Sequence, residues 1–478
     1  MRFWLAIALL LILVTAAVAY ARLPGNRESG IFDTNPPTPY FHYRPTGTLR
    51  GQVLVVHGLD CSRDIMNILS FGLADAGFEV FSIDLPGHGE SRSGFNAIQA
   101  RNVVGSVLDR LGQETAVLGH SFGGGVLLDL SGDRPMGRMV LFSPAPIPLQ
   151  TVQAEHVLVL VGQFDPGRLR AWVPQIESSA TGTFEFRDLA WTGHSGGLFR
   201  ANVIASVAKW LGGDATAIHT TRRLVLLALI LLSSIALGVT LLPSWPGGVA
   251  VPQRKYREAS EAGTDGVVVQ DRTENSAHLP ILYYTIASLA AAGVLALVNV
   301  AAWLRIFAMD YLIGFFFLAG LILLSRCKGL TLKKSPRLWI GVTAAAYLIV
   351  VTGSLGASEL AHTVASGGRW WRFLAILIVS LPMFLADEYL LRPIQPARKA
   401  AGAAIVTRIL IGAIAVSGAL ILNRQSAFLL LIAYLVVLFW IGLWFAAGAV
   451  RKRTDPFTAA CFAAIVQAWA FAAFFVMV

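Results

Sequence analysis

Hydrophobic and polar positions divide the chain into two parts of different character. Between residues 51 and 213, short apolar runs alternate with amphipathic stretches. Such alternation predicts an α/β domain, that is, a mostly parallel sheet flanked by helices. The predicted strands are the runs at 52–56, 80–83, 116–118, 139–142, 157–161 and 183–189.

Long apolar stretches dominate the remainder of the chain. Those in residues 221–478 are each near the roughly 20 residues that a helix needs to cross the hydrocarbon layer. They predict an all-α transmembrane domain of about eight helices. The predicted spans are 224–242, 280–304, 308–325, 338–356, 371–391, 404–422, 427–449 and 456–477.

The first 50 residues contain two further segments. Residues 1–20 hold an apolar run that is either a transmembrane anchor or a signal peptide, because Ala17-Val18-Ala19 resembles a cleavage site. We favour the anchor. Residues 21–50 are rich in Pro, Gly, Thr and Arg and predict a linker with room for one edge strand.

Composition and charge support a membrane protein. Hydrophobic residues make up 55% of the chain and charged residues 14%, whereas a soluble domain carries about 25% charged residues. The net charge of +10 resides mostly in short connectors such as "SRCKGLTLKKSPR" and "VRKRTD". This pattern fits the positive-inside rule better than it fits nucleic-acid binding.

The charge bias also predicts an orientation. Placing Met1 and Arg2 inside puts residues 21–220 outside and the basic connectors inside. The sequence therefore predicts an integral protein of the plasma (inner) membrane whose α/β domain faces the periplasm or the extracellular side. The inner connectors are 243–279, 326–337, 392–403 and 450–455.

One short motif carries candidate chemistry. In "AVLGHSFGGGVLL", Gly119-x-Ser121-x-Gly123 follows a predicted strand and precedes a predicted helix. This is the nucleophile-elbow pattern, in which glycines allow a tight turn that exposes the serine hydroxyl. The helix N-terminus favours negative charge that develops beside it.

A serine nucleophile needs a base and an oxyanion site. His194 and Asp165 each follow a strand-like run, so both are expected at the carboxyl edge of the sheet. His194 is the predicted base and Asp165 the residue that orients it, with Asp188 as the fallback. The backbone N–H groups of Leu59 and Phe122 are the predicted oxyanion donors.

Five pieces of the sequence together resemble a known family. They are "VVHGLD", "IDLPGHGES", "LGHSFGG", "LVGQFDP" and "TGHSGG", in that order. Residues 51–213 resemble the α/β-hydrolase-fold serine hydrolases, a family of esterases, lipases and peptidases, whereas the membrane domain resembles no family that we recognise. The resemblance implies a hydrolase of esters, thioesters or amides, or an acyltransferase. It implies no cofactor or metal.

One departure from the family concerns its cap. Only about a dozen residues separate the strands at 139–142 and 157–161, too few for a helical cap. The site should therefore be open. We expect the bilayer surface or the membrane domain to supply the missing wall, which suits a lipid-borne or bulky acyl substrate.

These observations predict a membrane-integrated serine hydrolase that works through an acyl-enzyme intermediate. The expected partners are a small-molecule, lipid or peptide substrate and the membrane lipids, with no nucleic acid. The alternative is a transporter or membrane scaffold whose hydrolase-like domain binds ligand without catalysis. In a third reading, the membrane helices present or move a lipid that the soluble domain processes. In the membrane domain, Glu388 and Arg392 are spaced for an ion pair at the membrane interface.

Overall fold

The computed structural model describes residues 2–241, 277–298, 303–306, 309–327, 337–356, 363, 368–422 and 429–475. Most of the predicted inner connectors at 243–279 and 326–337 therefore lie outside the described residues. Two compact units are present. One is an α/β unit over Ala8–Ser234, and the other is a helical unit formed mainly by Ile235–Val351 and Ala365–Ala473.

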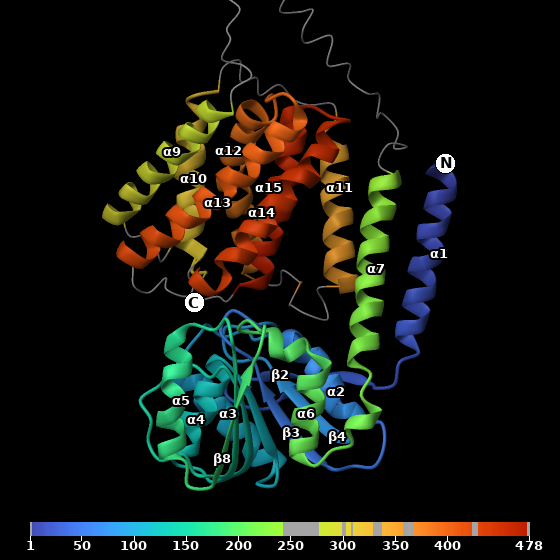
Figure 1. Ribbon diagram of the computed structural model, residues 1–478, viewed down its shortest axis with the longest axis vertical. Helices are drawn as coiled ribbons and strands as arrows, with labels where there is room; N and C mark the ends of the chain where they lie inside the picture. The colour runs from blue at the N-terminus through green and yellow to red at the C-terminus, as the bar shows by residue number, and fades with distance from the viewer. Residues whose placement is uncertain are drawn as a thin grey trace, which may run out of the picture. The chain divides into compact units, whose positions relative to one another are not determined.

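The α/β unit is built on a sheet of eight strands (Figure 1), in the order β1-β2-β4-β3-β5-β6-β7-β8. The six strands from β4 to β8 in this order are parallel, and β1 and β2 pair antiparallel at one edge. This confirms the predicted α/β fold. The strands are β1 (Arg27–Phe32), β2 (Thr38–Tyr43), β3 (Gly51–Val56), β4 (Phe78–Ile83), β5 (Ala116–His120), β6 (Met136–Phe142), β7 (Ala154–Gly162) and β8 (Thr183–Leu189).

Helices cover both faces of this sheet. In β7, Val157 and Val159 pack into the core on one face and Leu158 packs into the core on the other. Strands buried on both faces need continuous apolar runs, which explains why the sequence marks them clearly. The first face is covered by α3 (Ala97–Leu111), α4 (Phe122–Ser131) and α5 (Gly167–Ser179), and the second by α2 (Asn67–Asp75) and α6 (Ala201–Leu211).

The predicted linker at 21–50 is corrected by the structure. It contains two strands, and β2 pairs with β4 in the register Tyr40↔Ile83. The side chain of Tyr43 is fully buried in the core. Strands flanked by prolines give a weak sequence signal, although backbone pairing of β2 with β4 extends the sheet.

The absence of a helical cap is confirmed. Residues 143–153, between β6 and β7, form an extended connection without a helix. The carboxyl edge of the sheet is therefore not roofed by an inserted domain at this point of the chain.

The start of α7 (Thr220–Leu241) is fixed to the α/β unit by charged groups. Arg223 and Asp75 are both buried, with Nη2 3.4 Å from Oδ1. The guanidinium of Arg223 also lies over the ring of Phe71, and the backbone N–H of His219 donates to Asp75 Oδ2. The first turns of this apolar helix thus belong to the core of the α/β unit.

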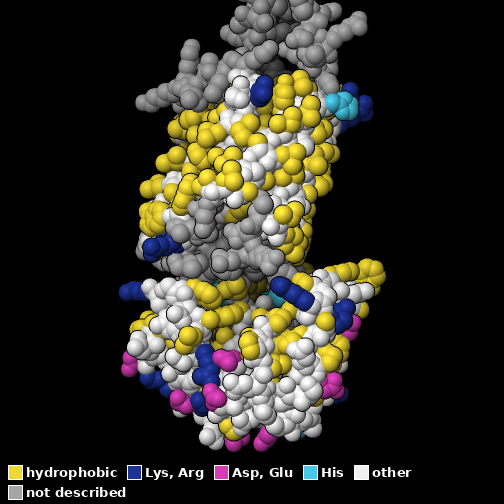
Figure 2. Space-filling model, turned by 90° about the vertical axis from the view of Figure 1, so that its left-hand side faces the viewer, with side chains coloured by type: hydrophobic (Ala, Val, Ile, Leu, Met, Phe, Trp, Pro, Cys, Tyr) yellow, Lys and Arg dark blue, Asp and Glu magenta, His cyan; other side chains and the backbone are white. Residues whose placement is uncertain are grey.

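The helical unit consists of apolar helices with hydrophobic side chains on its surface (Figure 2). Its helices are α9 (His278–Leu297), α10 (Met309–Leu324), α11 (Leu338–Val350), α12 (Arg369–Ala386), α13 (Ala397–Leu422), α14 (Leu429–Arg451) and α15 (Pro456–Phe474). Together with α7, they place a helix within each predicted span. Over the described ranges, seven helices are long and apolar enough to cross a membrane, including α1 (Arg2–Ala21) and α7, whereas α10 and α11 are shorter.

The described part of the helical unit contains three ion pairs, two on Glu388 and a separate one on Asp387. The predicted pair is present, with Arg392 Nη2 3.0 Å from Glu388 Oε1. Glu388 is nevertheless buried, and Arg451 approaches its other oxygen. In the separate pair Arg408, which is fully buried, donates to Asp387, which also accepts a hydrogen bond from Tyr284.

The pair of Asp387 with Arg408 predicts a large stability effect. In Asp387→Asn the buried guanidinium loses its counter-charge, and we expect the free energy of unfolding to fall by about 3–5 kcal/mol. The measurement is unfolding of the detergent-solubilised protein. Asp387→Asn with Arg408→Met should recover most of the loss, because neither charge is then buried alone. A single variant as stable as wild type would contradict this prediction.

Candidate active site

Ser121 occupies a tight turn between β5 and α4. Its backbone has φ 50° and ψ −115°, a conformation that is rare for a residue with a side chain. Its N–H donates to Phe142 O and its carbonyl accepts from the N–H of Ala145. Both β6 and the connection after it therefore hold the turn in place.

The glycines on either side of Ser121 are required by close backbone approach. A Cβ at Gly119 would lie 2.6 Å from Gly124 N, and a Cβ at Gly123 would lie 2.5 Å from the carbonyl oxygens of Val56 and His57. Real Cβ atoms do not tolerate such contacts, so the Gly-x-Ser-x-Gly pattern follows from the fold.

The structure brings the three predicted site residues together at the carboxyl edge of the sheet. His194 Nε2 lies 2.9 Å from Ser121 Oγ. On the other side of the imidazole, Nδ1 lies 2.6 Å from Asp165 Oδ1. This geometry lets one ring nitrogen accept the serine proton while the other donates to a carboxylate.

Asp165 is held by more than the histidine. Its Oδ2 accepts hydrogen bonds from Ser143 Oγ at 2.6 Å and from Gly162 N at 2.8 Å. Burial opposes its ionisation, but the hydrogen bond from His194, the nearby imidazole charge and these two donors outweigh burial, so the pKa of Asp165 lies below its ordinary value. The carboxylate therefore stays charged at neutral pH.

Ser143 is a residue that sequence reasoning missed. It follows β6 directly and has φ 44°, so its hydroxyl reaches the carboxylate of the neighbouring strand end. The available signal was its place after a strand at the same sheet edge as Asp165.

The fallback acid occupies a different environment. Asp188 is half exposed and pairs with Arg170 at 2.9 Å. It makes no described contact with His194, and the geometry favours Asp165.

The predicted oxyanion donors lie on the segments that border Ser121. Phe122 is the first residue of α4. A Cβ at Gly58 would come within 3.0 Å of Ser121 Cβ, so the loop carrying Leu59 passes beside the nucleophile. The role of both amides stays a prediction.

Two buried histidines brace these loops. His57 Nδ1 donates to Gly58 O and Nε2 accepts from Leu85 N, which fits the neutral imidazole. His120 Nε2 lies 3.3 Å from the carbonyl oxygen of His194. Burial lowers the pKa of His57 to about 4 and that of His120 to about 3.

These two pKa values predict acid sensitivity. Below an ordinary pKa near 6.5, the unfolded chain binds protons that buried His57 and His120 do not bind, so stability falls as pH decreases from there toward their folded pKa values. At pH 5 each histidine should cost on the order of 2 kcal/mol.

The measurement compares thermal unfolding at pH 7.5 and pH 5 for wild type, His120→Asn and the control His156→Asn, at a partly exposed position in β7. Because the comparison is made between variants, the contributions of other titrating groups to the pH dependence cancel. One such group is Asp64, whose pKa burial raises to about 7. His120→Asn should show a weaker pH dependence. An unchanged pH dependence would disprove the assignment.

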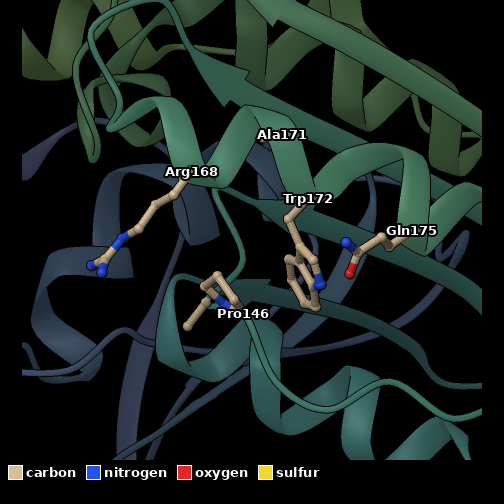
Figure 3. Close-up of a pocket in the computed structure, with 6 residues that line it drawn as sticks. Pro146, Arg168, Ala171, Trp172 and Gln175 are labelled. Atoms are coloured by element: carbon tan, nitrogen blue, oxygen red, sulfur yellow. The ribbon is translucent and has the colours of Figure 1, made fainter.

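An open cavity borders the site beyond Ala145. It has a volume of about 550 Å³ and is lined by Ala145, Pro146, Arg168, Ala171, Trp172 and Gln175. Figure 3 shows Arg168 and Trp172 projecting from α5 on the side that faces Pro146. Because the N–H of Ala145 donates to Ser121 O, this cavity adjoins the nucleophile turn.

Other candidate residues have structural contacts. Asp84 accepts hydrogen bonds from the backbone N–H groups of Arg63 and Glu90, as expected for a residue that stabilises its loop. Burial raises the pKa of the Cys61 thiol to about 12, so this thiol stays protonated. Within the described ranges, no group of three or more His, Cys, Asp or Glu side chains is arranged to hold a metal ion.

A mostly parallel sheet with a tight serine turn after β5 defines the class of α/β-hydrolase folds. The model of the alpha/beta hydrolase family matches residues 53–313, and the chain belongs to this family. Family membership and fold support a hydrolase.

A curated relative matches a shorter segment. It is the dihydrolipoyllysine-residue acetyltransferase component of the acetoin cleaving system of Cupriavidus necator, 40% identical over 87 residues. The match covers 17% of this chain and 23% of the relative, so the chain spans about a quarter of that protein's length.

Solved structures resemble the chain more distantly. A soluble variant of monoglyceride lipase from Saccharomyces cerevisiae is 15% identical, with coverage of 39% of this chain and 94% of that chain and a TM-score of 0.35. Carboxylesterase CesB from Bacillus subtilis is 14% identical, with coverage of 44% and 99% and a TM-score of 0.34. Likeness at this level carries no information about the substrate.

Proposed function

We propose that this protein is a membrane-integrated serine hydrolase that cleaves an ester, thioester or amide through an acyl-enzyme intermediate. The observation that carries the proposal is the 2.9 Å separation of His194 Nε2 and Ser121 Oγ, with Asp165 on the opposite ring nitrogen. Ser121 is the nucleophile, His194 the general base and then acid, and Asp165 the residue that orients and stabilises the imidazole.

The reaction follows from these positions. Ser121 Oγ attacks the carbonyl carbon while its proton passes to His194 Nε2, and the carbonyl electrons move to the oxygen, where the amides of Leu59 and Phe122 donate hydrogen bonds. Collapse of this intermediate expels the leaving group, which takes the proton from His194. Water then attacks the acyl-enzyme by the same route and releases the acid and free Ser121.

The test is covalent labelling of the nucleophile. A fluorophosphonate probe should label the full-length protein, and Ser121→Ala should abolish labelling because the hydroxyl is gone. Ser195→Ala is the matched control and should still be labelled, since Ser195 Oγ lies near His120 rather than near the base nitrogen. Labelling that survives in Ser121→Ala would remove the nucleophile assignment.

The same labelling reaction also tests the location and orientation of the protein. We propose an integral protein of the plasma (inner) membrane with the α/β unit on the periplasmic or extracellular side, supported by seven long apolar helices among the described residues and by the basic connectors of the sequence. A charged, membrane-impermeant fluorophosphonate should then label intact right-side-out vesicles. Labelling restricted to inside-out vesicles would reverse the orientation.

A second role for the helical unit is favoured by its buried charges. Ionisable side chains inside a membrane are costly and often functional, and Asp387 with Arg408 is such a pair. In this role the helices present or move a lipid substrate. Replacing the helical unit by a single-helix anchor should then reduce activity in cells but preserve probe labelling.

A further inference from the structure

Two large aromatic side chains stand exposed beside the site. Phe164 directly precedes Asp165, and Trp191 lies three residues before His194. Phe164 is 60% exposed and Trp191 is 82% exposed. Their ring centroids are 5.9 Å apart in an edge-to-face arrangement. Side chains of this size are usually at least partly buried, so the exposure of both rings indicates a surface that another molecule covers.

The backbone holds this pair in position. Trp191 has φ 53°, a conformation that is unusual for a bulky residue and that persists where surrounding contacts impose it. Its N–H donates to Gln163 Oε1 at 2.8 Å, and the N–H of Phe164 donates to Thr192 O at 3.0 Å. Hydrogen bonds therefore join the loops after β7 and β8 at the residues that carry the two exposed rings.

Positive charge accompanies the aromatic rings. Arg200 donates hydrogen bonds to Ala190 O and Thr192 Oγ1, on either side of Trp191. Both acceptors are neutral oxygens, so the guanidinium keeps its net charge beside the pair. Aromatic rings next to a cation suit a protein surface that lies at the boundary between acyl chains and anionic lipid headgroups.

The chain itself keeps the α/β unit at a lipid surface. Of the helices able to cross a membrane, α1 ends at Ala21, shortly before β1, and α7 begins at Thr220, shortly after α6. A unit attached at both ends to such helices stays within reach of the bilayer.

We propose that Phe164 and Trp191 form a docking surface for an anionic lipid bilayer. Docking would bring the carboxyl edge of the sheet, which carries the site, to a substrate that resides in that bilayer. A cap domain would not be needed to hold such a substrate. The inference rests on the proposed membrane-integrated serine hydrolase and adds a lipid-borne substrate class to it.

The first experiment measures docking without catalysis. In full-length protein with the background changes Cys61→Ser, Cys327→Ser and Cys461→Ala, a nitroxide is attached through Phe164→Cys and the protein is placed in phosphatidylcholine–phosphatidylglycerol vesicles. We expect the label to be accessible to oxygen and shielded from a water-soluble nickel complex. The control is Leu49→Cys, because Leu49 is exposed and precedes β3, at the end of the sheet where the parallel strands begin. Equal nickel accessibility at both positions would overturn the proposal.

The second experiment measures the consequence for activity. Wild type and Phe164→Ser/Trp191→Ser are assayed in these vesicles on water-soluble p-nitrophenyl acetate and on vesicle-borne p-nitrophenyl palmitate. The double variant should lose roughly ten-fold or more in kcat/KM on the palmitate, and less than about two-fold on the acetate. Equal losses on both esters would show that the pair serves the site itself and would overturn lipid docking. If wild type hydrolyses neither ester and Ser121 resists labelling, the proposed function fails, whereas the nitroxide measurement still decides the docking surface.

Discussion

His194→Ala is expected to lower kcat on an alkyl ester by roughly 10⁶-fold. Without the imidazole, Ser121 keeps its proton, because no described group other than His194 contacts Ser121 Oγ as a base. The measurement is steady-state hydrolysis by the full-length protein, with folding checked by thermal unfolding.

The combination of His194→Ala with Ser121→Ala should cost little more than either change alone. The two residues act as a unit, so losing one removes what the other contributes. Multiplicative losses would indicate that the two side chains act independently and would contradict the proposed mechanism.

Asp165→Asn should lower kcat by roughly 10⁴-fold. An amide in this place can donate to His194 Nδ1 and so favour the wrong imidazole tautomer, and it cannot stabilise the imidazolium. The measurement is kcat on the same ester, and KM should change little.

Asp188→Asn is the matched control, because Asp188 pairs with Arg170 at the surface. Its kcat should stay close to that of wild type. A larger loss in Asp188→Asn than in Asp165→Asn would reassign the acid to Asp188.

The strands that precede Ser121 and Asp165, β5 and β7, could be predicted because they are buried on both faces, whereas β8, which precedes His194, is a partly exposed edge strand. Runs such as Val157–Val161 are continuously apolar, and the structure contains a strand at each of them. Residues 21–50 were predicted to be a linker with room for one edge strand, whereas the structure has both β1 and β2 there. These two strands lie at the antiparallel edge and are surrounded by prolines, so the register with β4 comes from tertiary pairing rather than from local pattern.

The meeting of Ser121, Asp165 and His194 could be anticipated because each follows a strand of one parallel sheet. Their distances agree with that expectation, and their catalytic roles stay predictions. The place of Ser143 after a strand was visible in the sequence, but its hydrogen bond to Asp165 was not, because that bond depends on a positive φ and on adjacent pairing of β6 and β7. Likewise, the contact of Asp387 with Arg408 joins different helices, and hydropathy alone does not pair them.

The buried contact between Arg223 and Asp75 limits how the α/β unit can be separated from the rest of the chain. A recombinant piece ending at residue 213 would leave the Asp75 carboxylate in the protein interior without Arg223 or His219. A piece starting at residue 51 would uncover the hydrogen-bonding edge of β4. A soluble version should therefore retain both edge strands and the first turns of α7, with new polar residues on the newly exposed part of that helix.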